Sequence, residues 1–103
     1  MSQRTMQYMK KCIPIFSMFQ DEKRQKITQL LFENHELSVS SLTEKLSLSR
    51  PAVSHHLKLL LDADLVAVRQ EGKERYYRLN LKSALNLLKA LTASIEKDIE
   101  QTT

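Results

Sequence analysis

The segment SRPAVSHHLKLL, residues 49–60, carries guanidinium, hydroxyl, imidazole and ammonium groups within one short and otherwise apolar run. Arg50 is able to donate two hydrogen bonds to a guanine, and Ser54 is able to donate or accept one. Lys58 is suited to neutralise a phosphate. At helical spacing these groups and His55 fall on the side opposite the apolar residues. The segment predicts a helix that reads DNA, and the competing interpretation is an ordinary solvated helix face.

The start of this helix is marked by two residues. Ser49 is a typical N-cap, and Pro51 falls in the first turn, where a missing N–H costs nothing. We expect the helix to end at Asp62 to Asp64 and to bury Val53 and Leu57. Ser49 and Pro51 are therefore placed at the end of the helix that would approach DNA.

The two adjacent histidines are expected to play different parts. Neighbouring helical residues diverge by about 100°, so they do not readily share a metal ion. His55 lies toward the exposed side with Ser54. His56 lies nearer the core, and we interpret it as a packed, hydrogen-bonded structural residue.

A shorter helix is predicted just before this one, over about 41–46. Ser41 and Glu44 match a capping box, although Ser40 is an equally good cap. The connection to the next helix is too tight for an independent loop, so residues 41–63 are predicted to form a helix-turn-helix. Before it, Leu37 and Val39 are typical of a short extended segment.

A β-hairpin is predicted over residues 65–79. Val66 and Val68 alternate with less apolar neighbours, and a turn follows around Gly72, the single glycine of the chain. Its basic side chains are suited to track the phosphate backbone or to enter the minor groove, although a solubilising surface hairpin is the plainer interpretation. The basic residues assigned to DNA contact are Arg69, Lys73 and Arg75.

Long amphipathic helices are predicted at both ends, over 4–19 and 81–101. The first continues its apolar spacing across Pro14, which predicts a kinked helix. The last helix has more apolar residues than one buried face needs, so both helices are expected to meet a second subunit. The residues assigned to this interface are Met6, Met9, Phe16, Leu85, Leu88, Leu91 and Ile95.

Length and composition are consistent with one mainly helical domain over residues 1–103. The net charge of +4 and the isoelectric point near 9.3 suit a polyanionic partner or an ordinary soluble surface equally well. No apolar signal segment or membrane-spanning run is visible, which predicts a cytoplasmic protein. No nucleophile–base pair, phosphate loop or metal cage suggests an enzyme.

The run LSRPAVSHHLKLLLDADLVAVRQEGKERYYRLN resembles the ArsR-type winged-helix repressors of bacteria. The resemblance extends upstream to FSMFQDEKRQKITQLL, with Arg24 at the usual arginine, and to HELSVSSL, and it covers Lys10 to Leu91. It implies a mainly α fold with a small β-hairpin, the winged helix-turn-helix. It also implies a homodimer, paired through its first and last helices, that occupies a double-stranded DNA operator and is released by an effector. We expect that operator to be an imperfect palindrome.

The chain departs from this family at the residues that would bind metal. Many metal-sensing relatives have cysteines in the segment where this chain has Ser38 and Ser40, and hydroxyls are poor ligands for soft metals. Other relatives use histidines on the last helix, and residues 80–103 contain none. We therefore predict no metal site and no cofactor, and the effector stays unassigned. Ser47 stands in the turn where relatives often have glycine.

Two alternatives remain open from the sequence. The first is a winged helix that docks proteins and not DNA, although such a helix is expected to be apolar where Arg50 and Lys58 stand. The second is a redox-sensing repressor that uses Cys12, the single cysteine, either by oxidation or by pairing with the partner's Cys12. The plainer interpretation of Cys12 is a packed core thiol.

Overall fold

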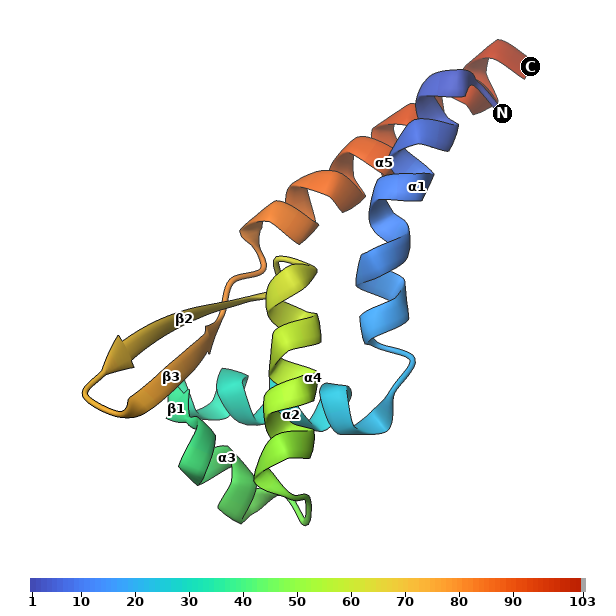
Figure 1. Cartoon of the computed structure of the whole chain (residues 1–103). Coiled ribbons are helices and arrows are strands. Elements are labelled where there is room, and N and C mark those ends of the chain that lie inside the picture. The colour runs from blue at the N-terminus through green and yellow to red at the C-terminus, as the bar shows by residue number, and fades with distance from the viewer. Residues whose placement is uncertain (103) are drawn as a thin grey trace.

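A computed structural model describes residues 1–102 of the chain (Figure 1). The fold is mainly helical with a small antiparallel sheet, as predicted. Thr103 lies outside the described residues. None of the helices within residues 1–102 is long and apolar enough to cross a membrane. The elements follow in the order α1 (Gln3–Met18), α2 (Glu22–Asn34), β1 (Leu37–Ser38), α3 (Val39–Lys45), α4 (Arg50–Asp62), β2 (Val66–Glu71), β3 (Glu74–Leu79) and α5 (Lys82–Thr102).

The body of the molecule is formed by α2, α3, α4 and the sheet, with its core between them (Figure 1). Each helix turns one apolar stripe inward, because burial of apolar surface is the main favourable term in folding. The largest side chains with almost no exposed surface are Ile27, Leu31, Leu42, Val53, Leu57, Leu60, Leu65 and Val66. This core fixes the direction in which α4 presents its other face.

The N-caps of α2 and α3 are polar side chains just before each helix. Asp21 caps α2, because its carboxylate accepts from the backbone N–H groups of Lys23 and Arg24. The predicted caps for α3, Ser41 or Ser40, are wrong. Ser38 caps α3 by accepting from the Ser41 backbone N–H at 3.0 Å. The helix therefore starts at Val39, which the alternating pattern had placed in an extended segment.

The sheet contains the predicted hairpin and one additional strand. Strands β2 and β3 are antiparallel, and Gly72 turns between them with a φ of 61°, a value that glycine adopts without steric cost. The short β1 pairs with the other edge of β3, so that Leu37 lies opposite Tyr77. The sheet order is β1-β3-β2. This pairing ties the start of α3 to the hairpin.

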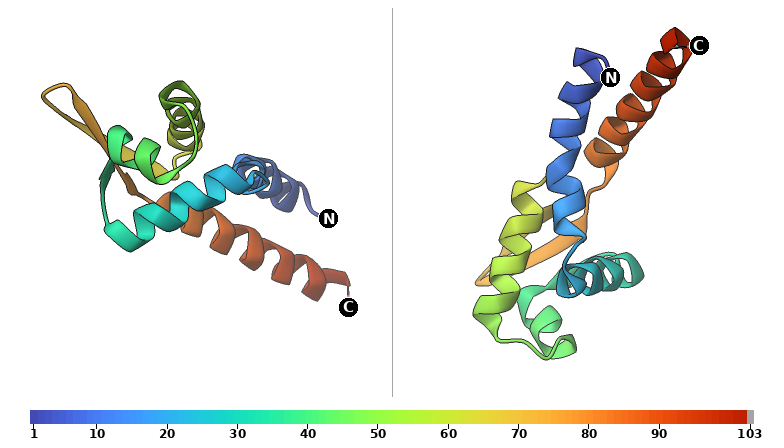
Figure 2. Two further views of the ribbon diagram at one scale, coloured as in Figure 1. Left: turned by 90° about the horizontal axis from the view of Figure 1, so that it is seen from below. Right: turned by 90° about the vertical axis from the view of Figure 1, so that its right-hand side faces the viewer.

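Helices α1 and α5 lie side by side and form an arm that projects from the body (Figures 1 and 2). The molecule measures 55 × 23 × 20 Å. Helix α1 passes through Pro14 as one helix. Cys12 and Leu91 are buried, and neither belongs to the main core of the body. Ile15 of α1 and Ala84 of α5 belong to the main core, so the arm joins the body there and continues beyond it with a thin interior of its own.

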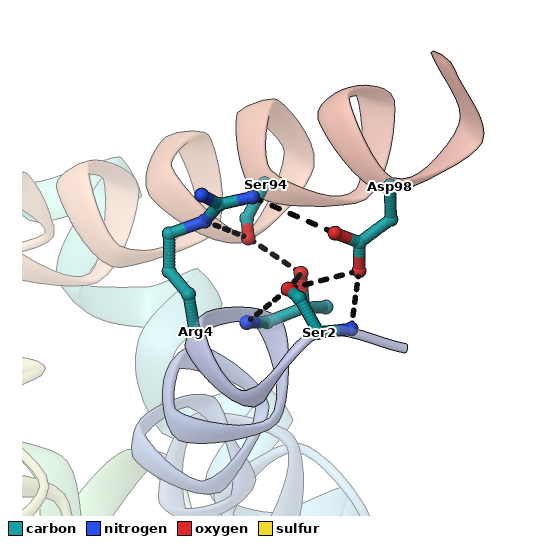
Figure 3. A network of polar contacts seen from close by, with 5 residues as sticks. Ser2, Arg4, Ser94 and Asp98 are labelled. Carbon is teal, nitrogen blue, oxygen red and sulfur yellow. Dashed lines mark hydrogen bonds and ion pairs between the residues drawn. The ribbon is translucent and has the colours of Figure 1, made fainter. Parts of the chain in front are cut away.

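A polar network joins the far ends of α1 and α5 (Figure 3). The Ser2 backbone N–H donates to Asp98 at 2.9 Å, and Arg4 Nε donates to the Ser94 hydroxyl at 2.9 Å. The hydroxyls of Thr5 and Ser94 are buried and hydrogen-bonded to each other. This network gives the buried polar groups their partners, which is the condition for burying them without a large penalty.

Candidate nucleic-acid interface

The predicted division of α4 into a buried and an exposed side is confirmed. Ser49 accepts from the Ala52 backbone N–H at 3.3 Å, and Pro51 lies in the first turn. Val53 and Leu57 have no exposed surface. The side chains of Arg50, Ser54, His55 and Lys58 are exposed on the other side. The helix therefore offers a polar, partly basic face.

Arg50 at the start of α4 is held by two other elements. Its Nη1 donates to the Ser40 hydroxyl at 2.9 Å, and its Nη2 lies 3.5 Å from Glu74 Oε1. Ser40 in turn donates to Glu74 Oε2 at 2.9 Å, and this hydrogen bond, with the nearby Arg50 charge, holds the pKa of Glu74 below its usual range. This cluster was not predicted from the sequence, because nothing local connects residues in α3, α4 and β3.

The basic residues of the hairpin occupy different surroundings. Arg69 donates to Glu36 at 2.8 Å and to Glu71 at 2.9 Å, and its guanidinium lies 4.5 Å from the centre of the Tyr76 ring. Lys73 lies in the turn beside Gly72 and is exposed, as is Arg75 on β3. Arg69, in the middle of β2, thus has three protein partners, whereas Lys73 lies exposed in the turn.

A hollow of about 400 Å³ lies between α4 and the hairpin. Ser54 and Lys58 line it from the helix, and Arg75 lines it from β3. Tyr77 and Asp62 lie in the same wall. The fold therefore brings together three of the residues that the sequence assigned separately to the helix and to the hairpin.

His56 is placed as predicted, against the body and away from the exposed face. Its Nδ1 lies 3.3 Å from Arg24 Nη1, and partial burial lowers its pKa. Arg24 also donates to the backbone carbonyls of Met18 and Ser17, so it joins the end of α1 to α2 and α4. His55 is exposed beside Ser54.

Ser38 and Ser40, the serines expected to stand where metal-sensing relatives have cysteines, both make hydrogen bonds within the protein. Ser38 is committed to capping α3, and the Ser40 hydroxyl is bonded to Glu74 and Arg50. Cys12 lies inside the arm with no exposed surface. Within residues 1–102, no group of three or more His, Cys, Asp or Glu side chains is arranged to hold a metal ion.

The arm exposes apolar side chains along both of its helices. Met6 and Phe16 on α1 are 41% and 49% exposed, and Leu85 on α5 is 49% exposed. A hollow of about 470 Å³ lies beside Leu85. It is lined almost entirely by apolar side chains, among them Ile15 of α1 and Leu88 of α5. Of the other residues assigned to a subunit interface, Met9, Leu88 and Ile95 are half-buried and Leu91 is 9% exposed. Leu91 therefore has little surface left to offer a partner.

Comparison with known proteins gives a consistent set of relatives. Residues 21–68 match the family model described as "Bacterial regulatory protein, arsR family". The chain is 36% identical over 72 residues to an uncharacterized HTH-type transcriptional regulator of Methanocaldococcus jannaschii, covering 70% of this chain and 81% of that protein. It is 38% identical over 66 residues to the arsenical resistance operon repressor of Staphylococcus aureus, covering 64% of this chain and 62% of that protein.

A solved structure agrees with the fold. The homodimeric winged helix-turn-helix DNA-binding domain of Mb0332 from Mycobacterium bovis superposes with a TM-score of 0.71 at 22% identity. The match covers 93% of this chain and 89% of that one. At this identity the likeness concerns the fold, and it includes the helical arm as well as the winged helix-turn-helix.

Proposed function

Because the chain belongs to the ArsR family of bacterial regulatory proteins, we propose that it is a homodimeric, sequence-specific DNA-binding regulator that represses transcription by occupying its operator. The family consists of transcriptional regulators. The observation that carries the proposal is the exposed polar face of α4, which lies beside a basic hairpin and shares a hollow with it. A helix with this face fits the major groove of B-DNA.

The proposed DNA contacts are of two kinds, contacts with base edges and contacts with phosphates. Arg50, Ser54 and His55 reach base edges from α4, and Ser49 and Pro51 place the start of that helix in the groove. The cationic groups bind the phosphate backbone, which supplies most of the affinity and none of the direct sequence readout. Those groups are Lys58, Lys73 and Arg75.

Arg69 takes a different role in this proposal. Its position in the sequence predicted a contact with DNA, but its guanidinium is already engaged by Glu36, Glu71 and the ring of Tyr76. We assign Arg69 to bracing the hairpin against the end of α2. Through it, the hairpin keeps a defined angle to α4.

The homodimer is formed by the arm. The exposed apolar residues Met6, Phe16 and Leu85 favour a second apolar surface over water. A two-fold axis through the arms would place the two α4 helices about one DNA turn apart, roughly 34–36 Å, on an imperfect palindrome. The Mycobacterium bovis domain of the same fold is a homodimer.

The two alternatives from the sequence gain no support from the geometry. A protein-docking helix would expose apolar residues where α4 exposes Arg50 and Lys58. Cys12 has no exposed surface, so an oxidant or the partner's Cys12 does not reach it without movement of the arm. The proposal therefore leaves the effector unassigned.

The test is to select genomic DNA fragments with the purified full-length protein and to sequence them. We expect enrichment of a short imperfect palindrome, bound with an affinity that falls steeply as salt rises. Neighbouring genes would then suggest the signal. Recovery of no enriched sequence would contradict sequence-specific binding and would favour the docking alternative.

A further inference from the structure

The cluster around Arg50 joins the three elements that would face DNA. Arg50 is the first residue of α4, Ser40 lies in the first turn of α3, and Glu74 is the first residue of β3. Glu74 accepts from the Ser40 hydroxyl at 2.9 Å and from the Ser40 backbone N–H at 3.4 Å. Glu74 is thus anchored to α3 independently of Arg50.

The guanidinium is only partly used by these contacts. Arginine has five N–H donors, and in Arg50 one terminal nitrogen contacts Ser40 and the other contacts Glu74. Donors remain for another acceptor, and a guanine edge accepts two hydrogen bonds from one arginine. The cluster therefore leaves Arg50 able to read a base while its position is already set.

The contacts between Arg50, Ser40 and Glu74 add little to the free energy of folding, so we expect their main effect on DNA binding. The side chains of Arg50 and Glu74 are 53% and 30% exposed. Ion pairs this exposed add little to stability, because water screens the charges and both side chains lose freedom. Ordering a long side chain before binding, however, removes part of the entropy that binding would otherwise cost.

We infer that Ser40 and Glu74 are positioning residues that hold the Arg50 guanidinium in the geometry with which it reads a base of the operator. The inference rests on the proposed function and adds a residue of the hairpin to sequence discrimination. The opposite arrangement is a latch, in which Glu74 competes with DNA for Arg50. The two arrangements predict changes of opposite sign when Glu74 loses its charge.

The experiment compares Glu74→Gln with Glu71→Gln. Glu71 is the cross-strand partner of Glu74 in the hairpin, and it contacts Arg69 but not Arg50. Arg69 keeps its contacts with Glu36 and the Tyr76 ring when Glu71 is neutral, so the hairpin stays braced in this control. Both substitutions remove one negative charge from the same part of the hairpin, so both are expected to strengthen binding to any DNA by a similar factor. The readout is the ratio of affinity for the selected palindrome to affinity for non-specific DNA at one salt concentration.

We expect Glu74→Gln to lower this ratio by about tenfold, the scale of one hydrogen bond to a charged group, and Glu71→Gln to leave it unchanged. Ser40→Ala is expected to lower the ratio in the same direction. In an Arg50→Ala background, Glu74→Gln is expected to cause no further loss, because both act through one guanidinium. Thermal unfolding of each variant checks that the fold is retained.

A ratio that rises with Glu74→Gln would overturn the inference in favour of the latch. A loss that persists in the Arg50→Ala background would also overturn it, because Glu74 would then act through another group. Wild-type protein that does not distinguish the palindrome from other DNA would instead overturn the proposed function itself.

Discussion

At the scale of single residues, the hydroxyls of two neighbouring serines are both engaged in hydrogen bonds within the protein. Ser38 caps α3, and Ser40 links Glu74 to Arg50. Each hydroxyl is already used in a hydrogen bond that a metal ion would have to break. Hydroxyls are also weak ligands for the soft metals and for arsenic, which prefer thiolates.

We therefore predict that zinc, nickel, cadmium and arsenite at micromolar levels do not release the protein from its DNA. Gel-shift titrations with each ion measure this directly. Cys12→Ser serves as the control, because an oxidant that releases wild type but not this variant would reveal a redox switch. Release by a metal with a fixed stoichiometry per dimer would refute the prediction.

Asp98 carries a second prediction at this scale. The backbone N–H of Ser2, together with side-chain hydroxyls and Arg4, lowers the pKa of Asp98 from 3.8 to about 2. A carboxyl whose pKa is lower in the folded state stabilises it above the unfolded pKa, and that contribution is lost as pH falls through the folded pKa. The arm is thus expected to lose this contact between about pH 4 and pH 2.

The measurement is urea unfolding of wild type and Asp98→Asn at pH 7 and at pH 2. Wild type is expected to be the more stable protein at pH 7. The difference is expected to shrink at pH 2, because the Asp98 carboxyl is then about half protonated in the folded protein and almost fully protonated in the unfolded protein. A difference that stays constant across this range would show that the charge of Asp98 does not support the arm.

At the scale of elements, the hairpin combines a braced strand with an exposed turn. Arg69 is held by Glu36 and Glu71, while Lys73 lies exposed in the turn. Only a cation that is free to approach a phosphate releases counterions on binding. Substitutions in the turn and in the braced part of β2 should therefore have different effects on DNA binding.

Lys73→Ala is expected to reduce the slope of log affinity against log salt by about one and to leave sequence preference intact. Lys89→Ala, an exposed lysine on α5, is the matched control and is expected to leave the slope unchanged. Binding constants measured at several salt concentrations supply both slopes. Equal slopes for wild type and Lys73→Ala would place the hairpin away from DNA.

At the scale of the whole molecule, the arm is elongated and exposes apolar residues that a single copy does not cover. Phe16 and Leu85 are each 49% exposed. Leu91, which the sequence had placed at the interface, is 9% exposed and contributes to the interior of the arm. A charge at Leu91 would disturb the protomer itself, so the better probes of assembly are the exposed residues.

We predict that Phe16→Glu combined with Leu85→Glu gives folded monomers, because a dimer would bury two unpaired charges in each subunit. Phe32→Glu is the control, since Phe32 is a 71% exposed residue on α2, outside the arm. Sedimentation velocity reports the assembly, and binding to the palindrome is expected to fall with it. A double variant that stays dimeric would move the interface elsewhere.

Local interactions explain what the sequence determined by itself. Asp21 and Ser49 cap their helices through residues two or three positions away, and Gly72 supplies the positive φ of a tight turn. The apolar spacing of α4 separates its core side from its polar side. Each of these features depends on neighbours within about one helical turn, and such neighbours are visible in a single sequence.

Contacts between distant residues were decided only by the tertiary structure. Ser40 meets Glu74 across 34 positions, Glu36 meets Arg69 across 33, and Ser2 meets Asp98 across 96. The chain offers each charged side chain many possible partners of opposite sign. Only the packing of the core decides which of them comes within reach. The sequence therefore identified Arg50 as a donor to DNA, but only the fold showed which side chains hold it.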